Sequence, residues 1–118
     1  MDEDTAYYIT KYLHETYPIY AKKHKSLRLD WTIDKNLAVF DDDVVPFHKG
    51  SVRYFKEIGR WTPEREKKNE ERIAHQAKLK QLWDETMKEA KQKGLKGKEF
   101  SKYWMGKRAK AGLWVPAQ

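Results

Sequence analysis

Residues 62–94 read TPEREKKNEERIAHQAKLKQLWDETMKEAKQKG and are typical of one long helix. Thr62 is a helix-capping residue type, Pro63 suits the first helical position, and acidic residues follow near the positive end of the helix. Gly94 predicts the end, because glycine adopts the left-handed conformation without steric cost. The first turns are almost wholly charged, so we expect them to be solvated or only lightly packed. The flank expected to pack contains Ile73, Ala77, the stem of Lys80, Trp83 or Asp84, and Met87.

A second helix is predicted over residues 98–111, after a turn at residues 94–97. Its aromatic side chains recur at i, i+3 and i+4 and therefore share one face. Gly112 predicts its end, and Pro116 prevents its extension. Two helices joined by so short a turn predict an antiparallel helical hairpin. Its joint core would contain Leu79, Leu82, Trp83, Met87, Phe100, Tyr103, Trp104 and Leu113.

The first half of the chain predicts shorter helices. Asp4 or Thr5 can cap a first helix. Pro18 interrupts it, and a second short helix would run to about His24. The first helix has one apolar stripe, which contains Tyr8, Ile9, Tyr12, Leu13 and Thr16.

Residues 26–47 predict an irregular stretch, in which the run Asp41-Asp42-Asp43 breaks any regular element. Apolar and polar residues alternate from Leu27 to Ile33, which leaves room for one short strand. A further short helix follows, with Val52, Phe55 and Ile58 on one face and Gly59 at its end. The fold class expected for the whole chain is therefore mainly α.

Composition bounds the class of protein. The chain has 118 residues, which suits one small domain or a piece of a larger protein. Charged residues make up 36% and aromatic residues 14%, and the aromatic content argues against a disordered chain. Cysteine is absent, so disulfides, thiol nucleophiles and cysteine-based zinc sites are excluded.

The net charge of +7 is unevenly distributed, because residues 51–118 carry most of the basic side chains. This asymmetry indicates two segments with different roles, which we place at residues 1–61 and 62–118. No apolar run approaches the ~20 residues of a membrane span. The acidic opening Met1-Asp2-Glu3-Asp4 is not a signal peptide. We therefore expect either a cytoplasmic protein or one whose true N-terminus is missing.

The sequence contains no motif of an enzyme or a metal site. Nucleotide-binding glycine loops, zinc-protease helices and hydrolase nucleophile elbows are all absent. None of the four histidines lies at helical ligand spacing from another, and the Asp41–Asp43 run lacks the rest of a calcium loop. Asp30 and Asp34 are more typical of surface residues than of a catalytic pair. We expect no enzyme activity, no cofactor and no metal.

The basic end of the chain has two interpretations. Cations interleaved with Phe100, Tyr103 and Trp104 can grip phosphates and stack on bases. Alternatively the aromatic residues form a core face and the lysines solubilise the opposite face, which is the interpretation we favour. Nucleic acid is therefore the less favoured partner, and a membrane surface less favoured still. The basic side chains concerned are Lys91, Lys93, Lys96, Lys98, Lys102, Lys107, Arg108 and Lys110.

Two segments carry a resemblance to a known family. Residues 7–15 read YYITKYLHE, and residues 45–59 read VPFHKGSVRYFKEIG. In order and spacing they resemble the C-terminal part of the TAXI family, the solute receptors of tripartite ATP-independent periplasmic (TRAP) transporters. Lys49 stands where that family usually has proline, and Ser51 where it usually has alanine. The resemblance covers about residues 4–61, and the helical hairpin looks like an extension.

The resemblance implies a two-lobed α/β parent that binds a small organic anion or amino acid in the periplasm. The parent delivers this solute to a TRAP membrane permease. This chain would be a helical C-terminal fragment that normally packs on the missing upstream lobes and does not bind solute alone. Apolar side chains that normally face the lobes would then be exposed, and the fragment would self-associate. The side chains concerned are Tyr8, Tyr12, Val52 and Phe55.

His48 and Arg53 match the second motif, so they are the candidate contacts to solute or permease. The other interpretation is that His48 braces a helix start and Arg53 lies on the surface. The alternative function for the whole chain is a small basic helical interaction module that binds nucleic acid or an acidic protein.

Overall fold

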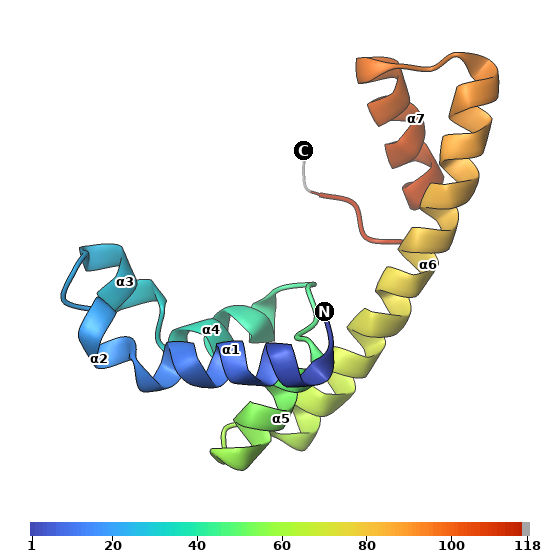
Figure 1. The fold of residues 1–118 in the computed structure, drawn as a ribbon. Coiled ribbons are helices and arrows are strands. Elements are labelled where there is room, and N and C mark those ends of the chain that lie inside the picture. The colour runs from blue at the N-terminus through green and yellow to red at the C-terminus, as the bar shows by residue number, and fades with distance from the viewer. Residues whose placement is uncertain (117–118) are drawn as a thin grey trace. The chain divides into compact units, whose positions relative to one another are not determined.

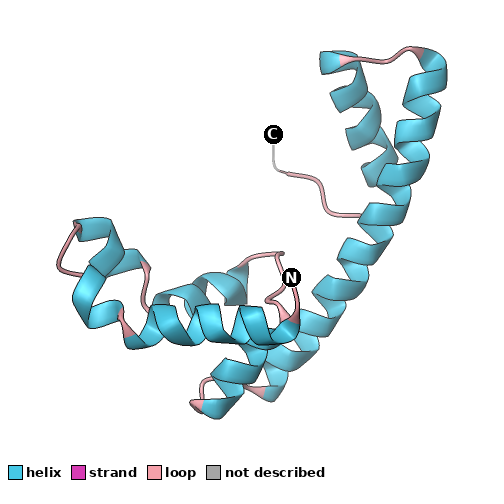
Figure 2. Ribbon diagram, viewed as in Figure 1, coloured by secondary structure: helices cyan, strands magenta, loops and turns pink. Residues whose placement is uncertain are grey.

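The computed structural model describes residues 1–116, which form seven helices and no strand (Figures 1 and 2). The helices are α1 Glu3–Glu15, α2 Tyr17–Tyr20, α3 Lys25–Asp30, α4 Ile33–Asp42, α5 Lys49–Glu57, α6 Pro63–Lys93 and α7 Gly97–Lys110. The predicted mainly α fold class is confirmed, and the prediction of one short strand is wrong. The chain divides into two compact units, Met1–Arg72 (unit 1) and Ile73–Gln118 (unit 2). None of the described helices is long and apolar enough to cross a membrane.

The capping residue of α1 is Asp2, not Asp4 or Thr5. The carboxylate of Asp2 accepts a hydrogen bond from the backbone N–H of Thr5 at 2.8 Å. This bond satisfies one of the free amides of the first turn. The acids at positions 3 and 4 then lie near the positive end of the helix, where negative charge is favourable.

The apolar stripe predicted for α1 faces solvent. Tyr8 is 64% exposed and Tyr12 67% exposed, whereas Ala6 and Tyr7 are buried. The helix has two adjacent faces with apolar content, and the packed face is the one that lets α5 approach closely. The expectation of one packing stripe through Tyr8 and Tyr12 is therefore wrong within unit 1.

Residues 25–42 are helical, where an irregular stretch was expected. His24 accepts a hydrogen bond from the Ser26 N–H at 3.2 Å and begins α3. Thr32 accepts one from the Lys35 N–H at 3.1 Å and begins α4. Two local caps therefore override the short alternating pattern that suggested a strand. The preceding helix α2 is shorter than predicted and ends at Tyr20.

The core of unit 1 is aromatic and lies around α5. Tyr7, Leu37, Tyr54 and Phe55 form the buried cluster, and Leu37 is only 1% exposed. Partly buried side chains surround the cluster, namely Ile33, Phe47, Ile58 and Trp61. Val52 is also buried, so Val52 and Phe55 do not present the free apolar surface that the sequence suggested. Tyr8 and Tyr12 do present it.

The end of α5 agrees with the prediction. Gly59 has a φ of 69°, which is the left-handed conformation that favours glycine. The backbone N–H of Arg60 then reaches the carbonyl of Phe55 at 2.7 Å, and the Gly59 N–H reaches that of Lys56 at 3.1 Å. These two bonds form a Schellman motif, which satisfies the last carbonyl groups of the helix.

The first turns of α6 are solvated on one side, as their charge predicted, and polar side chains on the other side anchor them in unit 1. Arg65 makes two hydrogen bonds to the carboxylate of Asp41, at 3.1 and 2.8 Å. Asn69 is buried and holds both backbone groups of Phe47, accepting from its N–H at 2.8 Å and donating to its carbonyl at 3.2 Å. Unit 1 therefore extends to Arg72, and the boundary between residues 61 and 62 stays a prediction.

Unit 2 is the predicted helical hairpin, in which α7 runs back beside the end of α6 (Figure 1). Trp83 packs edge-to-face against Phe100 and Trp104, with ring centres 5.5 and 5.1 Å apart.

Thr62 caps α6 by accepting a hydrogen bond from the Arg65 N–H at 3.2 Å, as predicted. The glycines at positions 94 and 112 adopt positive φ and end the two helices, also as predicted.

The packed flank of α6 differs from the predicted one. Ile73, Ala77, Lys80 and Met87 are exposed, and Met87 is 44% exposed although it was expected in the joint core. The inner flank contains His75, Leu79, Leu82, Thr86 and Ala90, and Thr86 is fully buried. These positions recur every three or four residues, as a helix face does, but polar members hide the pattern in the sequence.

Candidate functional site

The two segments that carry the resemblance are α1 and α5, which pack directly on each other. Gly50 lies at the point of closest approach. A Cβ atom added at Gly50 would lie 2.2 Å from the carbonyl oxygen of Glu3 and 2.7 Å from the Tyr7 nitrogen. Only a residue without a side chain allows the two backbones to come so close. We call this contact, with the charged side chains around it, the α1–α5 junction.

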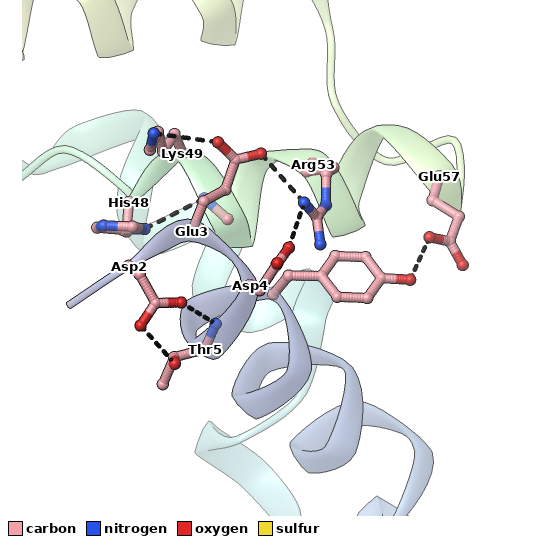
Figure 3. Close-up of polar contacts among 10 residues, drawn as sticks. Asp2, Glu3, Asp4, Thr5, His48, Lys49, Arg53 and Glu57 are labelled. Atoms are coloured by element: carbon pink, nitrogen blue, oxygen red, sulfur yellow. Dashed lines mark hydrogen bonds and ion pairs between the residues drawn. The ribbon is translucent and has the colours of Figure 1, made fainter.

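Ion pairs surround the junction (Figure 3). Glu3 lies between Lys49 at 3.1 Å and Arg53 at 3.2 Å, and Arg53 also reaches Asp4 at 2.9 Å. The interaction with Lys49 is the main cause that lowers the pKa of Glu3 below its ordinary value. Acids at the start of α1 thus pair with bases on α5, which aligns the two helices.

Arg53 also lies on the ring of Tyr7. Its guanidinium carbon is 4.1 Å from the ring centre, which is a cation–π contact. The Tyr7 hydroxyl donates a hydrogen bond to Glu57 at 2.5 Å, and this bond is the main cause that raises the pKa of Tyr7. Arg53 therefore contacts three residues of α1, so the structure places it in the junction rather than on a free surface.

His48 is the capping residue of α5. Its Nδ1 accepts the hydrogen bond of the Gly50 N–H at 3.1 Å, so the proton of the neutral ring is on Nε2. That Nε2 lies 3.2 Å from the carbonyl oxygen of Met1 and can donate to it. Both ring nitrogens are thus used within the junction, which agrees with His48 as the brace of a helix start.

Sequence reasoning found His48 and Arg53 but missed other members of the junction, among them Glu3, Tyr7 and Gly50. Glu3 and Tyr7 supply the other half of its ion-pair and cation–π contacts, and Gly50 allows its close approach. The sequence did contain a sign that Gly50 matters. Glycine is unfavourable in a helix, and Gly50 lies in the first turn of α5, where it neither caps nor ends the helix.

A second polar row continues along the same two helices. The hydroxyls of Thr10 and Ser51 lie 2.8 Å apart, and His14 Nδ1 lies 2.7 Å from the hydroxyl of Tyr54. Both pairs join α1 to α5 beyond the junction. Burial raises the pKa of Tyr54, because ionisation would leave a phenolate in an apolar core.

A cavity of about 250 Å³ lies beside this row. Its apolar lining includes Leu13, Trp31, Ile33, Phe47 and Phe55, and its polar lining includes Thr10, His14, Asp30, Asn36 and Ser51. Neither lysine nor arginine is among the described residues that line it. A carboxylate ligand would find an acidic residue and no lysine or arginine there, so the cavity does not suit an anion.

The remaining candidate polar residues lie apart from the junction. Within residues 1–116 no three histidine or acidic side chains gather in a way that could hold a metal ion. Asp34 pairs with Arg60, and Asp41 is held by Arg65, which is the main cause that lowers the pKa of Asp41. His75 accepts a hydrogen bond from the Trp114 N–H at 3.1 Å and so belongs to the hairpin.

A family model described as the NMT1-like family matches residues 1–59, which is half of the chain and includes α1 to α5. This family is a periplasmic solute-binding family related to TRAP receptors. No curated protein and no solved structure matches the chain significantly.

Proposed function

The chain belongs to the NMT1-like family, and from this premise we propose that it is the C-terminal part of a TAXI-type receptor for a TRAP transporter. The coarse function that the family supports is a solute-binding-type domain. The proposed role is binding rather than catalysis: the receptor captures a small organic anion or amino acid in the periplasm. It then delivers this solute to the membrane permease.

The observation that carries the proposal is the α1–α5 junction. The two segments that resemble TAXI receptors lie about 40 residues apart in sequence, and Gly50 and Arg53 of the second segment both lie against Tyr7 of the first. The two segments whose order and spacing resemble the receptor family are thus also in direct contact in the fold. This supports the view that residues 1–59 are one structural piece of a receptor.

In this proposal the exposed face of α1 packs on the upstream lobes of the receptor. Tyr8, Ile9 and Tyr12 lie on that face, and each is about half exposed or more. Large apolar side chains gathered on one helix face mark an interaction surface. The same face would drive self-association when the chain is isolated.

The solute would bind in the cleft between the lobes, not in the cavity beside α1. A carboxylate that leaves water is best stabilised by a cationic partner, whereas the lining of the cavity has neither lysine nor arginine and includes the acidic Asp30. His48 and Arg53 would then support the receptor indirectly, because their polar groups are used within the α1–α5 junction.

The test uses the complete protein that carries this chain, with a C-terminal affinity tag, expressed in its source cells. Osmotic shock separates periplasmic from cytoplasmic protein, and thermal unfolding of the purified product is followed against a panel of small dicarboxylates and amino acids. A ligand at 100 times its Kd should stabilise the protein by about 2.7 kcal/mol. We expect periplasmic release and stabilisation by one chemical class of anion.

Arg53→Gln is the matched variant. We expect it to lower the melting temperature of the ligand-free protein and to leave the ligand-induced increase unchanged. Loss of the ligand response with an unchanged ligand-free melting temperature would instead assign Arg53 to the solute. Retention of the tagged protein in the cytoplasm, with no response to any anion, would refute the receptor proposal.

A further inference from the structure

Unit 2 carries the whole net charge of the protein. Residues 1–72 contain 14 basic and 14 acidic side chains and are neutral, whereas residues 73–118 contain eleven basic and four acidic side chains. The excess of seven positive charges thus belongs to one helical hairpin. A charge density of this kind attracts polyanions and anionic surfaces.

The acids of unit 2 neutralise few of these charges. Asp84 pairs with Lys80 on the same helix, and Glu89 pairs with Lys107 at 2.7 Å. Six exposed lysines lie near the turn between α6 and α7, and none has a carboxylate partner in the described part of the chain. We call them the lysine tip: Lys88, Lys91, Lys93, Lys96, Lys98 and Lys102.

An apolar hollow lies between the lysines of the tip. Its lining contains the apolar residues Met87, Ala90, Leu95 and Phe100 together with Lys88, Lys91 and Lys96. Lysines with apolar side chains beneath them suit a membrane interface, because the stem covers apolar surface while the ammonium group stays at the headgroups. The hollow therefore favours a lipid surface over a purely polar one.

The three aromatic rings of α7 are engaged within the hairpin. Phe100 and Trp104 both pack against Trp83, and the Tyr103 hydroxyl donates to Glu89 at 2.5 Å. Binding of single-stranded nucleic acid relies on such rings as stacking platforms. Engagement of these rings within the hairpin disfavours nucleic acid as the partner.

The single arginine of unit 2 is also engaged. Arg108 is buried between the rings of Trp104 and Trp114, at 5.5 and 5.1 Å, and it donates to the carbonyl of Trp114. Arginine is the residue that recognises phosphates through paired hydrogen bonds, whereas lysine acts as a hydrated point charge. The accessible positive charge of unit 2 is thus all lysine, which suits diffuse attraction to a surface.

We propose that the lysine tip binds an anionic phospholipid surface, with the apolar hollow at the level of the headgroups. This inference rests on residues 73–116 alone and goes beyond the receptor function proposed for residues 1–59. Attraction falls with distance over the Debye length, about 8 Å at physiological ionic strength, so only the turn and its neighbours need to reach the lipid. The hairpin would hold the protein at the membrane surface without crossing it.

The test is co-sedimentation of the chain with phosphatidylcholine vesicles that contain or lack 30% phosphatidylglycerol. We expect binding only to the anionic vesicles, with weaker binding at 0.5 M than at 0.1 M salt. Lys96→Gln with Lys98→Gln removes two charges from the tip and should weaken binding about 25-fold, at about fivefold per lysine near the surface. Lys22→Gln with Lys23→Gln is the control, because it makes the same charge change in exposed residues of unit 1.

Three results would overturn the proposal. Equal binding to both vesicle types would remove the role of lipid charge. Equal weakening of vesicle binding by the two double variants would show that binding depends on net charge and not on the lysine tip. Tighter binding to a single-stranded oligonucleotide than to anionic vesicles at the same salt would assign the tip to nucleic acid. Circular dichroism of both variants checks that the helices are intact, and neither lysine pair makes a side-chain bond that folding requires.

Discussion

Substitution of alanine for Gly50 should destabilise unit 1, although alanine is the better helix former. In a helix interior the exchange of glycine for alanine stabilises by about 1 kcal/mol. At Gly50 the new Cβ would lie 2.2 Å from the Glu3 carbonyl oxygen, 2.7 Å from the Tyr7 nitrogen and 2.8 Å from the Ala6 Cβ. Two of these atoms belong to the backbone of α1, so no side-chain rotation relieves the overlap. The helix itself has to shift.

The magnitude follows from these opposing effects. Overpacking of a well-packed core costs about 1–3 kcal/mol, and rigid backbone obstacles place Gly50→Ala near the upper end. Subtraction of the helix-forming gain leaves a net loss of about 2 kcal/mol. For a unit of this size each kcal/mol corresponds to about 4–8 °C in melting temperature, so the expected decrease is roughly 8–16 °C.

The matched control is Gly106→Ala, which lies inside α7. A Cβ at Gly106 meets no atom within 4 Å, and its backbone is helical, so the same substitution should stabilise unit 2 by about 0.5–1 kcal/mol. Amide hydrogen exchange resolved by peptide separates the units: protection of α1 and α5 should fall in Gly50→Ala, and protection of α7 should rise in Gly106→Ala. Equal or increased protection of α1 in Gly50→Ala would refute the close contact of the two helices.

Three further results are expected. Asn69→Ala should cost about 1–2 kcal/mol in urea unfolding, because both backbone groups of Phe47 lose their partner; an unchanged midpoint would mean that water replaces the amide. Tyr12→Glu should reduce self-association of the isolated chain in sedimentation velocity at high concentration, since it places charge on the exposed face of α1; a monomeric parent chain would contradict this. The pKa of Asp41 is lowered from 3.8 by Arg65, so the pair stabilises the fold above about pH 4 and is lost as the pH falls through the folded-state pKa. The urea midpoint should therefore decrease between pH 5 and about pH 2.5, and less so in Asp41→Asn; equal acid sensitivity of the two proteins would count against the pair.

Helix ends were predictable where a few neighbouring residues decide them. Thr62 caps α6, and Gly59 and Gly94 end their helices, because the bonds concerned span at most five residues. The caps of α3 and α4 were missed, although His24 and Thr32 are visible in the sequence. Short helices with mixed polarity give no periodic signal strong enough to compete with an apparent alternation.

The α1–α5 junction was predictable only in part. The motif around His48 and Arg53 pointed to the correct segment, but not to its partner on α1. The pairing of Arg53 with Glu3 and Asp4 joins residues about 50 positions apart, so no local pattern announces it. The glycine at position 50 is visible in the sequence, but its role becomes clear only from the contact between α1 and α5.

The sequence by itself determined that this protein is helical, where the two long helices α6 and α7 begin and end, and that residues 1–59 are related to solute-binding proteins. Caps, glycine stops and motif spacing act over a few residues, and they hold in any tertiary setting. Only the tertiary structure decided which face of α1 is buried. Tyr7 and Tyr8 are equally apolar neighbours, and the choice between them depends on Gly50 bringing another helix within backbone contact, which no pattern inside α1 contains.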